Sequence, residues 1–266
     1  MSLSIQGKTA IVTGAGRGIG LAIARHFREA GANVVYADCD ESLLEVELGG
    51  QDSGRVRAFS GDLGERLTQS NLVSAAIDAF DHVDILVNAH RLVLQSDPEV
   101  TTEEQIARML RQNMSAALRL SQLVARRMAE QSGNDLPPVQ AGAIVNVVSL
   151  AAERPTEENL AYSIASAALV QATRTLAVTL APKRIRVNGL GFASVMSNQL
   201  QMRLREEPAL RDRLIAATPL ARIAGAEELG PAAQFLASEA AGFITGQILR
   251  IDGGRSLADG MTPAVY

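Results

Sequence analysis

The stretch that decides the fold of this chain is Thr13-Gly14-Ala15-Gly16-Arg17-Gly18-Ile19-Gly20. It directly follows a short apolar run, residues 9–13, and it opens a helical pattern. Small residues let the backbone turn tightly, and the first N–H groups of the following helix can bind phosphate. This strand–turn–helix arrangement predicts a dinucleotide-binding site. The residues expected to contact the cofactor here are Gly14, Gly16, Arg17, Gly18, Ile19 and Gly20.

Strand-like runs alternate with helical patterns along the whole sequence. The expected strands cover residues 9–13, 33–37, 56–60, 85–88, 143–149, 185–188 and 248–251. They are short and continuously apolar, as strands covered on both faces are. The alternation predicts an α/β fold, a single-domain Rossmann-type doubly wound parallel sheet of about seven strands with helices on both faces. No linker or repeat divides the chain, so residues 1–266 are expected to form one dinucleotide-binding domain.

The composition excludes several classes of function. The chain is 47% hydrophobic and 20% charged, with a net charge of −4 and no basic tract, which disfavours nucleic-acid binding. Cys39 is the only cysteine, so neither an intrachain disulfide nor a cysteine-rich metal site is expected. No uninterrupted apolar run reaches about 18 residues, which predicts no membrane span. The first residues do not resemble a secretion signal, and we expect a cytoplasmic protein without a metal.

Two further segments carry the chemistry. Tyr162 stands at the start of a helical pattern, 13 residues after Ser149, which ends a strand-like run. With the Thr-Gly-x-x-x-Gly-x-Gly spacing, they resemble the short-chain dehydrogenase/reductase family over nearly the whole chain. The resemblance implies that Ser149 polarises the substrate oxygen, that Tyr162 passes the proton, and that Asn113 anchors a water relay. These three residues are the expected catalytic set.

Ser166 stands where the family's Tyr-x-x-x-Lys segment has its lysine, which holds the nicotinamide ribose and acidifies the tyrosine. The only lysines, Lys8 and Lys183, lie at the start of a strand and after a helix, and neither is expected to replace it. An ordinary phenol has a pKa of about 10, and a cation within about 4–6 Å lowers it by roughly 1–3 units. Because alcohol oxidation needs the phenolate, we expect the substitution to impair oxidation more than carbonyl reduction.

The choice of cofactor depends on the end of the second strand. Asp38 can accept hydrogen bonds from the adenosine ribose and would repel a 2′-phosphate, whereas Arg17 could pair with one. The balance favours NAD over NADP. Asp62, followed by Leu63, resembles the family's adenine-contacting aspartate, and a helix N-cap is the alternative for it.

The nicotinamide end departs from the family pattern. Where the family has Asn-Asn-Ala-Gly, this chain has Asn88-Ala89-His90-Arg91, and Asn88 and Ala89 are still expected to contact the cofactor. His90 and Arg91 should either turn away or crowd the nicotinamide, and for His90 a surface or loop-capping role is favoured over acid–base work. Phe192-Ala193 replaces the family's Pro-Gly, and Val195 and Ser197 fall at the family's carboxamide contacts.

The sequence therefore favours an NAD(P)-dependent oxidoreductase that transfers hydride between a carbonyl and an alcohol of a small substrate, with a weakened proton relay. The alternative is a catalytically impaired dinucleotide-binding protein with a sensing or oligomer-partner role. Residues 197–219 should cover the pocket. Their mixture of apolar residues and arginines fits an ordinary amphipathic helix as well as a cover for a lipid-like or an anionic substrate. Apolar residues on several faces of the helical patterns 103–131 and 162–180 predict a homo-oligomer, a tetramer or else a dimer.

Overall fold

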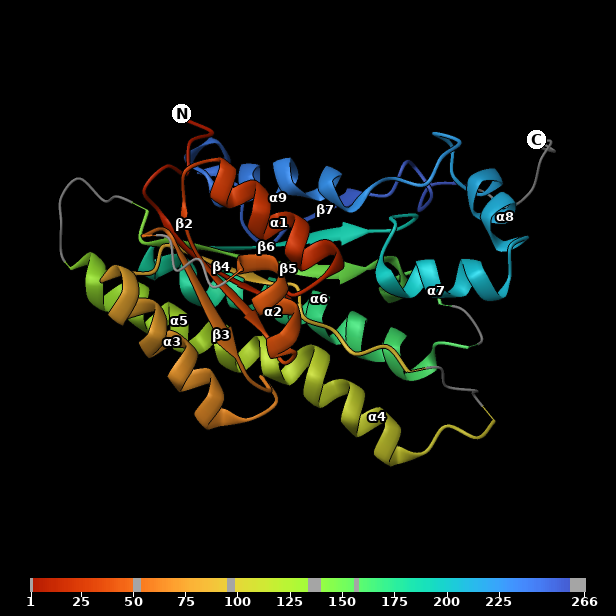
Figure 1. Cartoon of the computed structure of the whole chain (residues 1–266), viewed down its shortest axis with the longest axis horizontal. Helices are drawn as coiled ribbons and strands as arrows, with labels where there is room; N and C mark the ends of the chain where they lie inside the picture. The colour runs from red at the N-terminus through yellow and green to blue at the C-terminus, as the bar shows by residue number, and fades with distance from the viewer. Residues whose placement is uncertain (1, 50–53, 95–98, 134–139, 156–157, 259–266) are drawn as a thin grey trace.

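A computed structural model describes residues 2–49, 54–94, 99–133, 140–155 and 158–258. In these residues one parallel sheet of seven strands is sandwiched between two layers of helices (Figure 1). The strands are β1 (Thr9–Thr13), β2 (Asn33–Asp38), β3 (Val56–Ser60), β4 (Ile85–Asn88), β5 (Gly142–Ser149), β6 (Ile185–Phe192) and β7 (Ile248–Ile251). The helices are α1 (Gly18–Glu29), α2 (Glu41–Leu48), α3 (Arg66–Phe80), α4 (Glu103–Leu110), α5 (Ala116–Ser132), α6 (Leu160–Leu180), α7 (Asn198–Glu206), α8 (Leu210–Ala216) and α9 (Leu229–Ala237).

The strand order is β3-β2-β1-β4-β5-β6-β7, so the chain reverses its direction of travel across the sheet between β1 and β4. In open α/β sheets, ligands bind in the crevice at such a switch point, beyond the carboxyl ends of the strands. The predicted fold class is confirmed, including the doubly wound parallel sheet.

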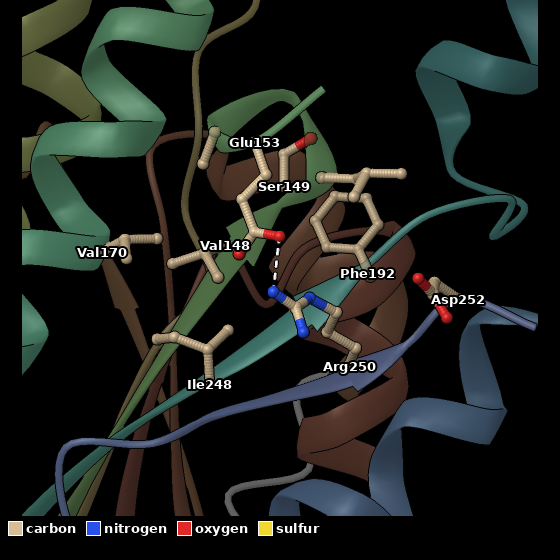
Figure 2. Close-up of a pocket in the computed structure, with 11 residues that line it drawn as sticks. Val148, Ser149, Glu153, Val170, Phe192, Ile248, Arg250 and Asp252 are labelled. Carbon is tan, nitrogen blue, oxygen red and sulfur yellow. Dashed lines mark hydrogen bonds and ion pairs between the residues drawn. The ribbon is translucent and has the colours of Figure 1, made fainter. Parts of the chain in front are cut away.

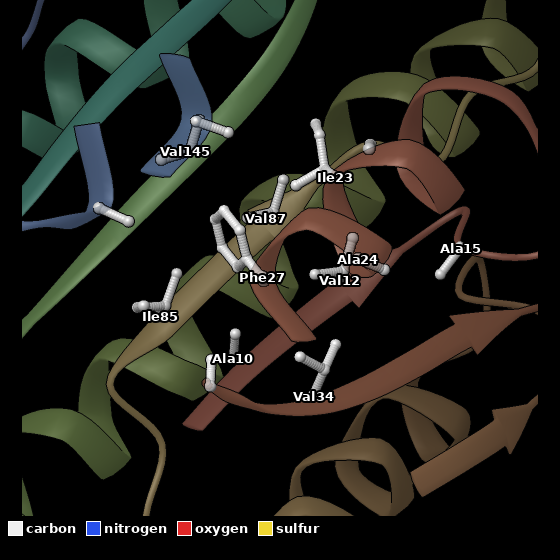
Figure 3. Close-up of a cluster of buried hydrophobic side chains, with 14 of the residues drawn as sticks. Ala10, Val12, Ala15, Ile23, Ala24, Phe27, Val34, Ile85, Val87 and Val145 are labelled. Carbon is white, nitrogen blue, oxygen red and sulfur yellow. The ribbon is translucent and has the colours of Figure 1, made fainter. Parts of the chain in front are cut away.

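The two faces of the sheet have separate apolar cores. One face is covered by α1 and α9, and Figure 3 shows Ile23 and Phe27 of α1 lying over side chains of β1, β2 and β4. The other face is covered by α3, α5 and α6, whose apolar stripes pack on Ile11, Leu86 and Ile144. Strands covered on both sides explain why the sequence showed continuous apolar runs instead of alternation.

Helix α6 is the most apolar of the long helices. Residues 160–183 are long and apolar enough, by length and composition alone, to cross a membrane. In the fold this helix is a core element, because Leu176 and Leu180 pack into the apolar core against β5 and β6.

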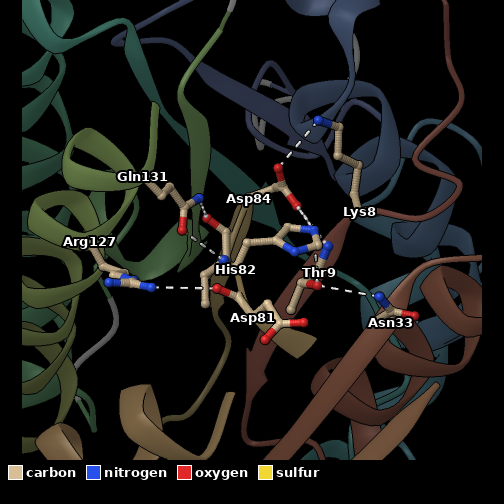
Figure 4. Close-up of polar contacts among 9 residues, drawn as sticks. Lys8, Thr9, Asn33, Asp81, His82, Asp84, Arg127 and Gln131 are labelled. Atoms are coloured by element: carbon tan, nitrogen blue, oxygen red, sulfur yellow. Dashed lines mark hydrogen bonds and ion pairs between the residues drawn. The ribbon is translucent and has the colours of Figure 1, made fainter. Parts of the chain in front are cut away.

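A polar cluster fixes the amino ends of β1 and β4, opposite the ligand-binding edge (Figure 4). The carboxylate of Asp84 accepts from the Thr9 N–H at 2.9 Å and pairs with Lys8 Nζ at 3.2 Å and His82 Nε2 at 3.1 Å. Gln131, in the last turn of α5, donates from Nε2 to the carbonyl of Val83 in the loop before β4 at 2.6 Å. One of the two lysines is thus bound at the end of the sheet that lies away from the predicted active site.

Two of the differences between the predicted and the observed elements are larger than a single residue. Strand β6 continues to Phe192, four residues beyond the prediction, since it pairs with both β5 and β7. The helical pattern 103–131 is interrupted by a π-helical turn, Arg111–Ser115, between α4 and α5.

Candidate active site

The glycine turn brings the loop after β1 into contact with the loop after β4. Gly14 has a φ of +66°, and a Cβ atom on it would lie 2.8 Å from the Cα of His90. A larger residue would therefore be strained and would also push the two loops apart. The turn leads directly into α1, where Arg17 is the N-cap and makes no side-chain cap. The first N–H groups of α1 thus have no side-chain acceptor at the cap, which suits a pyrophosphate.

Asp38 lies against the same turn. Its Oδ2 accepts from the Gly16 N–H at 2.9 Å and its Oδ1 from the Asp40 N–H at 3.1 Å, and the residue is only 9% exposed. A Cβ on Gly16 would approach the Asp38 carboxyl carbon to 3.0 Å. The carboxylate is therefore held at the end of β2, beside the glycine turn, as a ribose acceptor must be.

The two predicted adenine-side residues have local structural roles. Asp62 Oδ1 accepts from the Gly64 N–H at 2.7 Å and from Gln112 Nε2 at 3.3 Å. The N-cap of α3 is Glu65, so the alternative interpretation of Asp62 as a helix N-cap is wrong. The Leu63 side chain belongs to the apolar core under α3 and α5.

Of the two roles expected for His90, the surface role is wrong, because the ring is packed against the end of β1. Its Nδ1 lies 2.7 Å from Thr13 Oγ1, and its Nε2 is buried without a hydrogen-bond partner in the described part of the chain. Burial lowers the pKa of His90 to about 4, against the opposing effects of Asp38, Asp62 and the Gln112 backbone. The imidazole is therefore neutral at pH 7.

The preceding residues tie β4 to its neighbours. Asn88 Nδ2 donates to Asn146 Oδ1 at 2.8 Å and to Ser121 Oγ at 3.0 Å, so its side chain is directed into the fold. The Ala89 N–H donates to Thr13 Oγ1 at 3.0 Å. Thr13 thereby fixes the turn after β4. The position of this threonine directly before the glycine turn is the sequence signal for that role.

Ser149 and Tyr162 lie on the wall of one cleft of about 790 Å³, together with Val195 and Ser197. Ser149 ends β5, and its Oγ accepts from the Ala151 N–H at 3.2 Å, which leaves the hydroxyl proton free for another acceptor. Tyr162 lies in the first turn of α6 and is 8% exposed. The structure thus brings the predicted serine and tyrosine together with the predicted carboxamide contacts.

Asn113 lies in the π-helical turn and is 5% exposed. Its amide pairs with the backbone of one residue, accepting from the Leu92 N–H and donating to the Leu92 carbonyl, both at 2.7 Å. π-Helical turns are often found at functional sites, because they redirect a side chain. Here the redirected amide anchors the segment that carries Arg91.

The lysine is missing in space as well as in sequence. Ser166 is 5% exposed on α6, one turn after Tyr162. Lys8 is paired with Asp84 at the opposite end of the sheet. Lys183 follows α6 at its far end, about 30 Å from Tyr162 along the helix at 1.5 Å per residue. Neither lysine can take the place of the family's cation.

Two departures from the family pattern contact each other in the same cleft. The guanidinium carbon of Arg91 lies 4.6 Å from the centroid of the Phe192 ring. Figure 2 shows Phe192 between Ser149 and Arg250, which is paired with Glu153. Arg91 and Phe192 are about 100 residues apart in the sequence, and no sequence pattern indicates that they contact each other. Among the described residues no cluster of His, Cys, Asp and Glu could hold a metal ion.

The glycine turn at a sheet switch point, the Asp38 acceptor and the Ser149–Tyr162 cleft define a nucleotide-dependent oxidoreductase. A family model described as enoyl-(acyl carrier protein) reductase matches residues 14–256. An uncharacterised oxidoreductase of Thermotoga maritima is 34% identical over 257 residues, which cover 95% of this chain and 98% of that protein. The 7alpha-hydroxysteroid dehydrogenase of Escherichia coli is 33% identical over 95% of this chain and 96% of its own.

Solved structures agree with the sequence relatives. A gluconate 5-dehydrogenase from Burkholderia cenocepacia, crystallised with NADP and tartrate, superposes with a TM-score of 0.86 at 28% identity, over 97% of this chain and 98% of that one. The chain belongs to the short-chain dehydrogenase/reductase family, whose members are NAD(P)-dependent oxidoreductases of alcohols and carbonyls.

Proposed function

We propose that this enzyme is an NAD-preferring carbonyl reductase and alcohol dehydrogenase whose proton relay works without the family's lysine. The observation that carries the proposal is the joint position of Ser149 and Tyr162 on one cleft, beside Val195 and Ser197. NAD(H), when bound, supplies or accepts the hydride. Its pyrophosphate suits the uncapped start of α1 and its adenosine ribose suits Asp38.

In the reducing direction the substrate carbonyl oxygen accepts the Ser149 hydroxyl proton as a hydrogen bond. The Tyr162 hydroxyl then gives its proton to that oxygen as the carbon accepts hydride, so that the C=O double bond becomes a C–H and an O–H bond. In the oxidising direction the phenolate must take the alcohol proton. A phenol without a neighbouring cation is rarely ionised at neutral pH, so oxidation is the weaker direction.

Arg91 adds a positive charge to this cleft at a position where the family has glycine. The cleft is lined by Arg91 and Tyr162 from different elements, and Arg91 stacks on Phe192. A guanidinium held over a ring cannot hydrogen-bond a ribose as a lysine does, so Arg91 does not take over the lysine's role of holding the cofactor.

The competing proposal is a dinucleotide-binding protein whose hydride chemistry is severely impaired. The specific observations that favour it are Ser166 and the contact of two bulky residues, Arg91 and Phe192, at positions where the family has small ones. The two proposals differ in turnover. A panel of ketones and alcohols is assayed by nicotinamide absorbance with the wild type and with Tyr162→Phe. Activity that Tyr162→Phe abolishes supports the enzyme, and an inert wild type that binds NAD(H) supports the competitor.

A further inference from the structure

The substrate cleft is strongly cationic. Its described lining contains five arginines and no aspartate or glutamate. The arginines are Arg91, Arg154, Arg203, Arg213 and Arg255. A cleft with one sign of charge on its walls attracts ligands of the opposite sign. The chain as a whole has a net charge of −4, so this concentration of positive charge is a local property of the cleft.

Two of these arginines are already neutralised by carboxylates. Arg203 Nη1 lies 2.9 Å from Glu158 Oε2, and Arg213 forms an ion pair with Glu207. Their side chains line the cleft but contribute little free charge. They are therefore matched controls for the other arginines.

Arg154 and Arg255 lie on one wall of the cleft and bind neutral groups. Arg154 Nη2 donates to the Ser256 carbonyl at 2.9 Å, which places it beside the segment that carries Arg255. Arg255 Nη1 donates to Ser194 Oγ at 3.2 Å. Neither guanidinium forms an ion pair with a carboxylate of the described residues. Two cations on one wall of the cleft, without a carboxylate partner in the described part of the chain, both favour a bound anion.

The surroundings of Arg255 strengthen this interpretation. Burial lowers the pKa of Arg255, opposed by Asp252, so its charge is partly removed from water. The oxygens of Asp252 accept N–H groups of Gly254 and Ser256. Ser194, which accepts from Arg255, is 8% exposed and has a φ of +52°, a conformation that few non-glycine residues adopt. Non-glycine residues in such backbone conformations cluster at active sites and ligand sites.

We propose that the wall formed by Arg154 and Arg255 binds an anionic group of the substrate, a carboxylate or a phosphate. The reacting alcohol or carbonyl then lies at Ser149 and Tyr162, which line the same cleft. Planar guanidinium groups match both anions with paired N–H donors, which fixes the orientation as well as the charge. This inference rests on the proposed function for the place of the reacting carbon, but the anion site itself does not require turnover.

The anion site is tested by calorimetric titration of NAD-saturated protein with tartrate and, separately, with inorganic phosphate. We expect the wild type to bind at least one of them, and the preferred anion identifies the group. Arg255→Gln and Arg154→Gln should each weaken that binding roughly 10- to 100-fold, the effect of losing a charge-assisted hydrogen bond. Arg213→Gln, whose charge is already paired, should change it less than about twofold. Circular dichroism confirms that each variant is folded, and Arg154, which is exposed, provides the variant that leaves the core intact.

A turnover arm separates this inference from the proposed function. D-gluconate and D-glucitol 6-phosphate are each compared with the uncharged D-glucitol. The inference is overturned if neither anion binds, or if Arg213→Gln weakens binding as much as Arg255→Gln does. Specific anion binding without turnover of any substrate leaves the anion site standing and rejects the proposed function. Turnover of D-glucitol without binding of either anion supports the proposed function and rejects the anion site.

Discussion

Arg91 stacks on Phe192, with 4.6 Å between the guanidinium carbon and the centroid of the ring. The first residue follows β4 and the second ends β6, at positions where the family resemblance implies glycine and proline. Two bulky replacements that touch are best understood as one change, in which the ring provides the surface on which the cation rests. Asn113 holds the adjacent Leu92 backbone by two hydrogen bonds, so the position of Arg91 is fixed from both sides.

We therefore predict that Arg91 and Phe192 are energetically coupled. The test is a double-mutant cycle of Arg91→Met, Phe192→Leu and the double variant. The loss in unfolding free energy of the double variant should be smaller than the sum of the two single losses by about 0.5–2 kcal/mol, the range of cation–π pairs. Urea unfolding monitored by circular dichroism measures it. Additive losses would mean that the contact contributes nothing to stability.

Restoring the ammonium should favour oxidation. Ser166→Lys is expected to shift the rise of the alcohol-oxidation rate towards lower pH by roughly 1–3 units, because a cation near a phenol stabilises the phenolate. Below that rise the rate should increase about 10- to 1000-fold. Ser166→Met is the matched control, since it fills similar space without charge. An equal effect of both variants would assign the change to packing in the buried helix.

Asp38 should make NAD(H) bind more tightly than NADP(H). We expect at least a tenfold difference in Kd by calorimetry, since a 2′-phosphate would meet a carboxylate that is held by Gly16. Asp38→Ala should reduce this difference, because it weakens the binding of NAD(H) and strengthens the binding of NADP(H). Arg17→Gln should weaken NADP(H) alone. Tighter binding of NADP(H) to the wild type would show that Arg17 outweighs Asp38.

His90 should make the fold sensitive to acid. Its pKa is lowered to about 4 in the fold, whereas an unfolded histidine has about 6.5, so the unfolded chain binds the proton first. The contribution of the neutral His90 to the free energy of unfolding is therefore fully present above about pH 6.5. It is lost as the pH falls towards 4, by up to about 3 kcal/mol. His90→Asn keeps a polar group near Thr13 and should flatten this part of the stability–pH curve. An unchanged slope in urea titrations from pH 7 to 4 would contradict the assignment.

We expect a homotetramer. Val178 and Ile164 on α6 are 78% and 40% exposed, which is unusual for apolar residues on a long helix that packs in the core of one chain. Light scattering at micromolar concentration should give about four times the chain mass of 28.2 kDa. Val178→Glu should lower that mass if this face is an interface, and Val46→Glu on α2, equally exposed, serves as the control. A monomer mass for the wild type would exclude the tetramer.

The sequence alone determined the fold and the phosphate-binding turn, because both depend on local patterns. Continuous apolar strands, helical stripes and a glycine turn between them are encoded within segments of a few residues. The strand predicted from the sequence at residues 185–188 is shorter than β6, because Gly189 and Gly191 weaken the strand pattern. In the fold, pairing with β5 and β7 maintains the strand to Phe192.

The tertiary structure decided which side chains meet at the nicotinamide end. The His90 ring contacts Thr13, Asn113 pairs with Leu92 through a π-helical turn, and Arg91 stacks on Phe192. The cationic wall joins Arg154 to the backbone beside Arg255, and these residues are far apart in the sequence. The direction of a side chain depends on what packs against it, and these partners come from loops that only the assembled sheet brings together.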